Sequence, residues 1–258
     1  MALPTPPVKP DPNHQSTERE LREDLAAAYR LIALHGMTDT VYTHLSVRVP
    51  GPGGSHLFLV NPYGLLFEEI TASSLVLVDA AGEPAQPTAW PVNPAGFVIH
   101  SALHLGNPRA QCVMHTHTLA GMTVAALEGG LLPVNQISTE FHGRVATHDY
   151  EGVADDDNLS ERERLVRDMG DRPCMILRNH GLLTAGRTVA EAFYWMYYLE
   201  QACRIQVAAL STGATLSLPP PEVVERARAQ SPDSPTQGWL LWQAMRRKLD
   251  REQPDYRD

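Results

Sequence analysis

The chain has 258 residues, a formal net charge of −9 at neutral pH and 43% hydrophobic residues. This length can bury the core of one large domain, and the acidic balance argues against general binding to nucleic acids or anionic membranes, which need a basic surface. Cys112, Cys174 and Cys203 lie in apolar surroundings, which is typical of reduced thiols in a cytoplasmic protein. The acidic charge fits a small-molecule substrate better. No apolar run approaches membrane-spanning length, so we expect a soluble, cytoplasmic protein.

The first third of the chain predicts an arm, a helix and several strands. Residues 1–15 are proline-rich and polar, and we expect them to be disordered. Thr17 and Glu20 have the spacing of a capping box, which begins a helix that ends near Gly36. The apolar alternation of residues 45–49, the run 57–60 and the run 75–79 indicate a hairpin and a third strand.

Helices and one irregular segment are expected in the middle of the chain. Pro94 suits the first turn of a helix over 94–105, and the small apolar residues 119–127 favour a helix packed closely on a sheet. Periodicity is lost over 131–152 while polar side chains accumulate, which is typical of a functional loop. Residues 158–169 predict a charged amphipathic helix.

The C-terminal part predicts three more helices. Thr188 and Glu191 have the pattern of a second capping box, and the helix 189–210 that follows is apolar nearly all round. Such a helix is buried on more than one side, in a large core or against another subunit. Helices near 221–230 and 239–249 follow a triple proline. We therefore divide the chain into an arm (1–15), a metal-binding domain (16–215) and a helical extension (216–258) that could dock on a neighbouring subunit.

Three histidines at the ends of apolar runs indicate a metal site. His115 and His117 end the run that begins at Cys112, and because side chains alternate along a strand, both imidazoles project to one face. A second apolar run, from Cys174, delivers His180 in front of a glycine. Three neutral imidazoles with an open position are typical of a catalytic site. We expect one divalent ion per chain, and the ligand type permits Zn, Mn, Fe or Co.

Two motifs resemble a known family. The segment 93–127, with His115-Thr116-His117, and the segment 179–186 with the helix after it look like the class II aldolase and adducin head family. The resemblance covers about residues 17–215. It implies an α/β fold, a single three-layer α/β/α domain around a largely antiparallel central sheet. It also implies a homotetramer with active sites between subunits, and a divalent metal held by His115, His117 and His180.

The chain departs from this family where the catalytic helix begins. In the family's sugar-phosphate aldolases this helix begins Pro-Ser-Ser-Glu, with serines that hold phosphate and a glutamate that is the acid/base. Here Pro94 and Ala95 stand at the serine positions and Gly96 at the glutamate position, while Thr43-His44 replaces a Gly-Asn pair. A phosphate cradle needs hydroxyls and free backbone N–H groups, and Pro94 offers neither. We expect no phosphorylated sugar, and we interpret Gly96 as leaving room for a wider, planar ligand.

Lewis-acid chemistry remains without that glutamate. Decarboxylation needs an electron sink and a proton donor but no base, and the family's decarboxylases of hydroxylated aromatic or pyridine dicarboxylates resemble this chain in Ala95-Gly96-Phe97 and in the loop 148–152. We predict a metal-dependent lyase that decarboxylates, without oxidation, a small unphosphorylated hydroxy-aromatic or pyridine (di)carboxylate. Candidate proton donors are Glu140, His44 and Tyr150. Candidate substrate-binding residues are Arg144, as a carboxylate clamp, with Asn61, Asn93 and Phe97.

Other interpretations of the same residues stay open. The three candidate donors also suit loop-stabilising hydrogen bonds, and Arg144 also suits a surface ion pair. Three other functions are compatible with the sequence. They are a retro-aldol lyase for an unphosphorylated hydroxy-keto acid with Glu140 or Tyr150 as acid/base, a mononuclear Fe(II) oxygenase, and a non-catalytic adducin-like interaction module.

Overall fold

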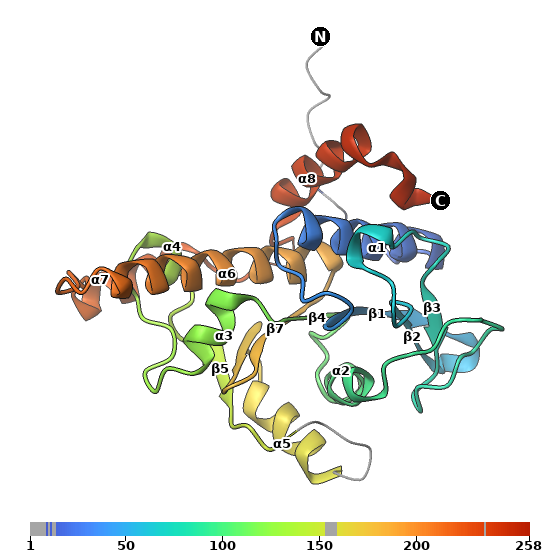
Figure 1. The fold of residues 1–258 in the computed structure, drawn as a ribbon, viewed down its shortest axis with the longest axis horizontal. Coiled ribbons are helices and arrows are strands. Elements are labelled where there is room, and N and C mark those ends of the chain that lie inside the picture. Colours follow the sequence, from blue (N-terminus) through green and yellow to red (C-terminus); the bar gives the residue numbers. More distant parts are fainter. Residues whose placement is uncertain (1–8, 10, 12–13, 153–158, 235) are drawn as a thin grey trace.

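A seven-stranded sheet with helices on both faces forms the body of the protein (Figure 1). The computed structural model describes residues 9, 11, 14–152, 159–234 and 236–258. Most of the arm expected at 1–15, and Asn158 at the expected start of a helix, lie outside the described residues. No helix in the described ranges is both long and apolar enough to cross a membrane.

The sheet is antiparallel except at one edge. Its strands are β1 (His44–Pro50), β2 (His56–Val60), β3 (Val76–Val78), β4 (Cys112–Thr116), β5 (Val145–His148), β6 (Cys174–Leu177) and β7 (Gly181–Gly186), in the order β3-β2-β1-β4-β7-β6-β5. Only β5 and β6 are parallel among these pairs. The expected hairpin is confirmed, because β1 and β2 pair antiparallel across the short helix η1 (Pro52–Gly54). The largely antiparallel three-layer fold is confirmed as well.

One sequence prediction was wrong in part. Residues 131–152 are not irregular throughout, because they contain the short helix α4 (Gln136–Thr139) and the edge strand β5. Each element has only four residues, which is too few for a period to show above the surrounding polar residues.

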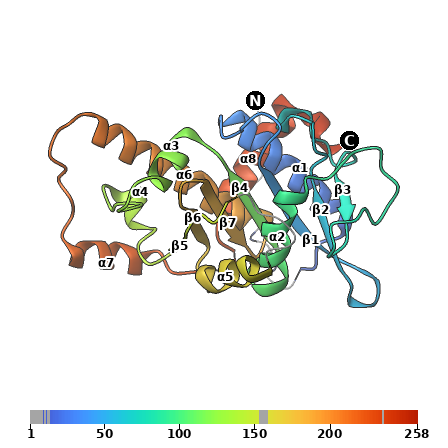
Figure 2. The same ribbon diagram turned by 60° about the horizontal axis from the view of Figure 1, so that its bottom comes forward.

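The helices form two layers, one on each face of the sheet (Figures 1 and 2). One layer holds α1 (Glu18–Leu34), α3 (Leu119–Ala125) and α6 (Val189–Ser211), with α8 (Trp239–Glu252) on the outside of α1 and α6. The other layer holds α2 (Pro94–Gly106) and α5 (Leu159–Met169). The remaining elements are α7 (Pro221–Gln230), η2 (Phe67–Glu69) and η3 (Pro254–Arg257).

The helix starts follow the sequence signals only in part. Thr17 and Glu20 form the complete capping box expected for α1. At α6 the Thr188 hydroxyl accepts the Glu191 N–H at 3.0 Å, but the Glu191 carboxylate accepts the backbone N–H of Arg187 and pairs with Arg109 at 2.7 Å. The second capping box is therefore only half formed, because the Glu191 carboxylate forms a buried ion pair instead of accepting the backbone N–H of Thr188.

Alternation along β4 divides its side chains between the two layers. Cys112 and Met114 join the core beneath α1 and α6, whereas Val113 joins the core beneath α2 and α5. His115 shares the parity of Val113, so it faces the α2 side of the sheet.

The C-terminal helices complete the core of their own chain. Trp195 of α6, Trp242 and Leu249 of α8 and Tyr256 of η3 are buried in the larger core cluster. Arg257 pairs with Glu23 of α1 at 2.7 Å. The apolar circumference of α6 is thus largely covered within the chain. Helix α8 packs on α1 and α6, and its additional docking on a neighbouring subunit stays a prediction.

Candidate metal centre

Three histidines converge at one end of the sheet. His115 lies in β4, His117 directly follows that strand, and His180 lies in the turn between β6 and β7. One nitrogen of each side chain lies within 4.8 Å of the other two, and His115 Nε2 and His117 Nε2 are 2.8 Å apart. Within the described ranges these residues form the group of three that could hold a metal ion.

The turn that carries His180 has a conformational reason for its sequence. Asn179 has φ +55°, a left-handed conformation that asparagine tolerates better than most residues. At Gly181 a Cβ would lie 2.5 Å from the Thr116 carbonyl oxygen and 3.1 Å from the His117 ring, so only glycine fits. The tripeptide Asn179-His180-Gly181 therefore lets the β6–β7 turn bring an imidazole against β4.

Hydrogen bonds orient the ligand nitrogens. His115 Nδ1 donates to the Leu182 carbonyl oxygen at 2.9 Å, and His117 Nδ1 donates to the Asp39 carboxylate at 3.0 Å. Each bond fixes the tautomer and leaves Nε2 free for a metal. The sequence analysis missed Asp39, because nothing in its local pattern ties it to a residue 78 positions away.

Burial also prepares the site for a cation. Burial, with the neighbouring histidines, lowers the pKa of His115 well below its usual value and lowers that of His180 to about 4. Neutral imidazole is the form that binds metal, so protons compete weakly at neutral pH. The donor set of three imidazoles with outer hydrogen-bond partners fits a divalent transition metal.

His44 fills the space next to the triad. It is the partner of His115 in the β1–β4 ladder, and the two ring centroids are 5.3 Å apart. A Cβ on Gly96 would overlap the His44 ring, with even the farther Cε1 only 2.9 Å away. The expectation that Gly96 leaves room for a wider ligand was therefore wrong, since the imidazole of His44 takes that room.

A buried chain of hydrogen bonds sets the tautomer of His44. His104 Nδ1 can only donate to the Ala110 carbonyl oxygen, at 2.6 Å, so its Nε2 must accept from the Ser46 hydroxyl at 2.6 Å. Ser46 then accepts from His100 Nδ1 at 2.5 Å, and His100 Nε2 accepts from His44 Nδ1 at 2.8 Å. Burial lowers the pKa of His44 to about 3, so the ring is neutral and its Nε2 carries a free lone pair.

The structure brings some of the predicted residues together. His44, Asn61, Asn93 and Phe97 line one small cavity with Gly96, and the Asn61 amide oxygen accepts the Tyr29 hydroxyl at 2.9 Å. Tyr150 is half-exposed on the other side of the triad, with its ring centroid 6.4 Å from that of His180.

Glu140 and Arg144 lie elsewhere. The Glu140 carboxylate accepts from the hydroxyls of Tyr194 and Ser231, both at 2.8 Å. Arg144 is buried over the Trp195 ring and donates to the Glu140 carbonyl oxygen at 3.0 Å. Arg144 precedes β5, whose far end lies beside His180, and at about 3.3 Å per residue this places it roughly 13 Å along the strand from that end. Within one chain these two residues therefore do not join the triad.

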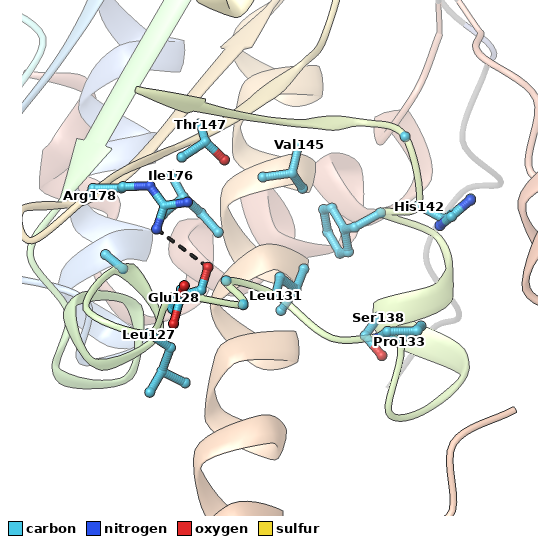
Figure 3. Close-up of a pocket in the computed structure, with 15 residues that line it drawn as sticks. Leu127, Glu128, Leu131, Pro133, Ser138, His142, Val145, Thr147, Ile176 and Arg178 are labelled. Atoms are coloured by element: carbon cyan, nitrogen blue, oxygen red, sulfur yellow. Dashed lines mark hydrogen bonds between the residues drawn. The ribbon is translucent and has the colours of Figure 1, made fainter. Parts of the chain in front are cut away.

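A larger cavity lies beside α3 and β5, with a volume of about 210 Å³ (Figure 3). No triad residue lines it. Arg178 does, and its guanidinium donates to the Glu128 carbonyl oxygen at 3.4 Å. Arg178 also lines a smaller cavity that contains His180, so a cation lies between this cavity and the triad.

Comparison with known proteins agrees with this geometry. The model of the family described as class II aldolase and adducin N-terminal domain matches residues 23–207. The chain belongs to this family. It is 48% identical to a protein of Caulobacter vibrioides named "Putative aldolase class 2 protein", over 100% of this chain and 98% of that one.

Two solved structures of the family share the fold over nearly the whole chain. An aldolase II superfamily protein from Pseudomonas syringae has a TM-score of 0.87 and 51% identity, over 95% of this chain and 98% of that one. An L-fuculose 1-phosphate aldolase from Glaciozyma antarctica has a TM-score of 0.82 and 29% identity, over 96% and 97%. The three-histidine group is therefore consistent with the divalent metal site of class II aldolases.

Proposed function

We propose that this chain is a divalent-metal-dependent carbon–carbon lyase that decarboxylates a small, unphosphorylated hydroxy-aromatic or pyridine (di)carboxylate without oxidation. The observation that carries the proposal is that a neutral imidazole lies beside the triad where the sugar-phosphate aldolases have an acidic side chain. Gly96 stands where the sugar-phosphate aldolases carry their glutamate, and the His44 ring occupies the space. No carboxylate base remains there to start a retro-aldol cleavage.

The divalent ion, held by His115, His117 and His180, would supply a Lewis acid that chelates a carboxylate and the oxygen next to it. Zn, Mn, Fe and Co all suit three imidazoles, and availability decides between them.

The protein's own side chains hold the substrate. His44 Nε2, with its free lone pair, accepts a hydrogen bond from the ring hydroxyl. Arg178, which lines the cavity beside His180, takes the carboxylate-binding role that the sequence suggested for Arg144. The serine positions of the phosphate cradle are Pro94 and Ala95, so the site favours a carboxylate over a phosphate ester.

The reaction balances without an oxidant. The bond between the ring carbon and the carboxylate breaks, CO₂ leaves, and the electron pair stays on the ring carbon. A proton then forms the new C–H bond. It is delivered from the side of the triad that carries Tyr150, because the opposite side is filled by His44 and α2.

A retro-aldol lyase for an unphosphorylated hydroxy-keto acid is the second candidate. The similarity to the aldolase of Glaciozyma antarctica favours it, and it would use the same triad. It requires a base, and among the side chains beside the triad His44 Nε2 has the free lone pair for that task.

The experiment is a substrate screen under anaerobic conditions. Protein reconstituted with each of the four metals is incubated with hydroxylated benzoates, phthalates and pyridine dicarboxylates, and CO₂ and aldehydes are measured. We expect CO₂ from at least one acid, and none from His180→Ala. Aldehyde release from a hydroxy-keto acid instead would establish the second candidate. Turnover only in the presence of oxygen would show an oxygenase, and failure to bind any metal would favour the non-catalytic module.

A further inference from the structure

The buried His148 and the partly buried Asp168 form a pair close to the metal centre that the mechanism above does not use. His148 ends β5, and Asp168 lies in the last turn of α5, which packs beside that strand (Figure 2). His148 Nδ1 donates to the Asp168 carboxylate at 2.8 Å. The sequence analysis missed the pair, because the two residues lie 20 positions apart on different elements.

The second nitrogen of His148 has no hydrogen-bond partner among the described residues. The side chain is only 6% exposed, and within the described part of the chain Nε2 is buried without a hydrogen bond. An unsatisfied buried polar atom costs about 1–3 kcal/mol, so such atoms in folded proteins call for an explanation. Because Nδ1 carries the proton that it donates to Asp168, Nε2 of the neutral ring presents a lone pair.

A small cavity joins His148 to the triad. His148 lines a space of about 20 Å³ together with Tyr150, Leu177, Arg178 and His180. This volume holds one water molecule or one oxygen of a ligand. The register of β5 on β6 pairs His148 with Leu177, so both His148 and His180 lie at the same end of the sheet. Asp168 does not line the cavity, which leaves Nε2 as the ring nitrogen available to it.

The charges around His148 keep Asp168 ionised. Partial burial opposes ionisation, but hydrogen bonds from His148 and Arg167 outweigh it and hold the pKa of Asp168 below its usual range. Glu151 and Arg164 form an ion pair nearby. An ionised carboxylate that accepts from Nδ1 orients an imidazole and stabilises its protonated form, as in other Asp–His pairs.

We propose that His148, oriented by Asp168, is the proton-transfer residue of this site. Its protonated Nε2 donates to the water molecule that the small cavity holds, and this water donates one of its own protons to the substrate carbon that has lost CO₂. The N–H bond breaks and leaves its electron pair on Nε2, while one O–H bond of the water breaks as the new C–H bond forms and the water regains a proton from Nε2. Solvent then reprotonates the His148 imidazole. The assignment rests on the proposed lyase function and deepens it, because it names the donor that acts on the Tyr150 side of the triad.

The test measures three properties of each variant: turnover, metal content and fold. His148→Gln is expected to lower kcat by about 10²- to 10⁴-fold with unchanged metal content and circular dichroism. Asp168→Asn keeps the shape of the pair but removes the charge, and it should lower kcat and displace the pH–rate profile. The matched control is His142→Gln, which breaks an exposed histidine–carboxylate pair with Glu225 at 2.9 Å and should leave turnover unchanged. Tyr150→Phe should keep most of the activity.

Two outcomes overturn the assignment. The first is a kcat of His148→Gln within about threefold of the wild-type value. The second is a loss of kcat in Tyr150→Phe as large as the loss expected for His148→Gln. If the screen finds aldol cleavage instead of decarboxylation, the proposed reaction fails, but the same variants are measured on it, because an enolate must also be protonated.

If the screen finds no substrate, a binding measurement that needs no turnover tests the assignment. In zinc-loaded protein with ¹⁵N-labelled histidine, pyridine-2,3-dicarboxylate is expected to shift the Nε2 resonance of His148, and less so in Asp168→Asn. If that resonance stays unchanged up to the solubility limit of the acid, and no substrate is turned over, the assignment is wrong.

Discussion

The packing of His44 against Gly96 makes an unusual prediction for a helical glycine. Replacing glycine by alanine in a helix ordinarily raises the free energy of unfolding by up to about 1 kcal/mol. Here the added methyl group would overlap a ring that is buried and hydrogen-bonded to His100. Gly96→Ala should therefore destabilise the protein.

The magnitude follows from two opposing terms. Overpacking a buried site costs about 1–3 kcal/mol, and the helical preference returns at most about 1 kcal/mol. We expect Gly96→Ala to lower the free energy of unfolding by about 1–2 kcal/mol in the wild-type background. In the His44→Ala background the clash is gone, and the same change should be neutral or stabilising by up to about 1 kcal/mol. The coupling between the two sites is then about 2 kcal/mol.

The assay is urea unfolding of the metal-free protein at one fixed protomer concentration, for the four members of the cycle. Gly129→Ala is the control, because a Cβ there would meet Leu132 only at 3.9 Å. If Gly96→Ala had the same effect in both backgrounds, within about 0.5 kcal/mol, the argument that His44 and Gly96 share one space would be refuted. Gly96→Glu should likewise be tolerated better in a His44→Asn background than alone.

Four further predictions concern the site and the assembly. Asp39→Ala should weaken metal binding by about 10- to 100-fold, because His117 loses the carboxylate that accepts its Nδ1–H. Glu68→Ala, which removes an exposed carboxylate, should leave metal binding unchanged. Titration with a competing chelator measures both affinities. Thr43→Gly should raise the free energy of unfolding by about 1 kcal/mol, because Thr43 has φ +67° and a buried hydroxyl without a partner in the described chain. Thr43→Val removes the hydroxyl but keeps the strained backbone, so it should raise the free energy of unfolding by less in the same urea assay. Burial lowers the pKa of His44 and His104 to about 3, so below about pH 6.5 the unfolded chain binds more protons than the native one. As the pH falls below that value, the free energy of unfolding of the metal-free protein should decrease by about 1.4 kcal/mol per pH unit for each ring. Equal urea midpoints at about pH 6 and about pH 4.5 would contradict this. The homotetramer implied by the family resemblance stays a prediction, which light scattering would refute by a mass near 28.4 kDa.

The corrections to the sequence analysis share a physical cause. The interpretation of Gly96 as free space treated one position alone, whereas the ring that fills it comes from β1, far along the chain. Glu140 and Arg144 were grouped with the triad because they lie in the polar segment 131–152, between the two motifs that carry the histidines. The fold instead directs Glu140 to Tyr194 and Ser231, at the opposite end of β5 from His180.

The sequence by itself determined the elements whose signal is local. The capping box at Thr17, the β1–β2 hairpin and the placement of His115 and His117 on one face follow from periodicity and capping, which act within a few residues. The departure at Gly96 was also visible without a structure. Tertiary structure alone decided the partners of these residues: Asp39 on His117, the chain from His44 to the Ala110 carbonyl, and Asp168 on His148. Each of these contacts joins separate elements, and the sheet order and helix packing that bring them within hydrogen-bonding distance are properties of the whole fold.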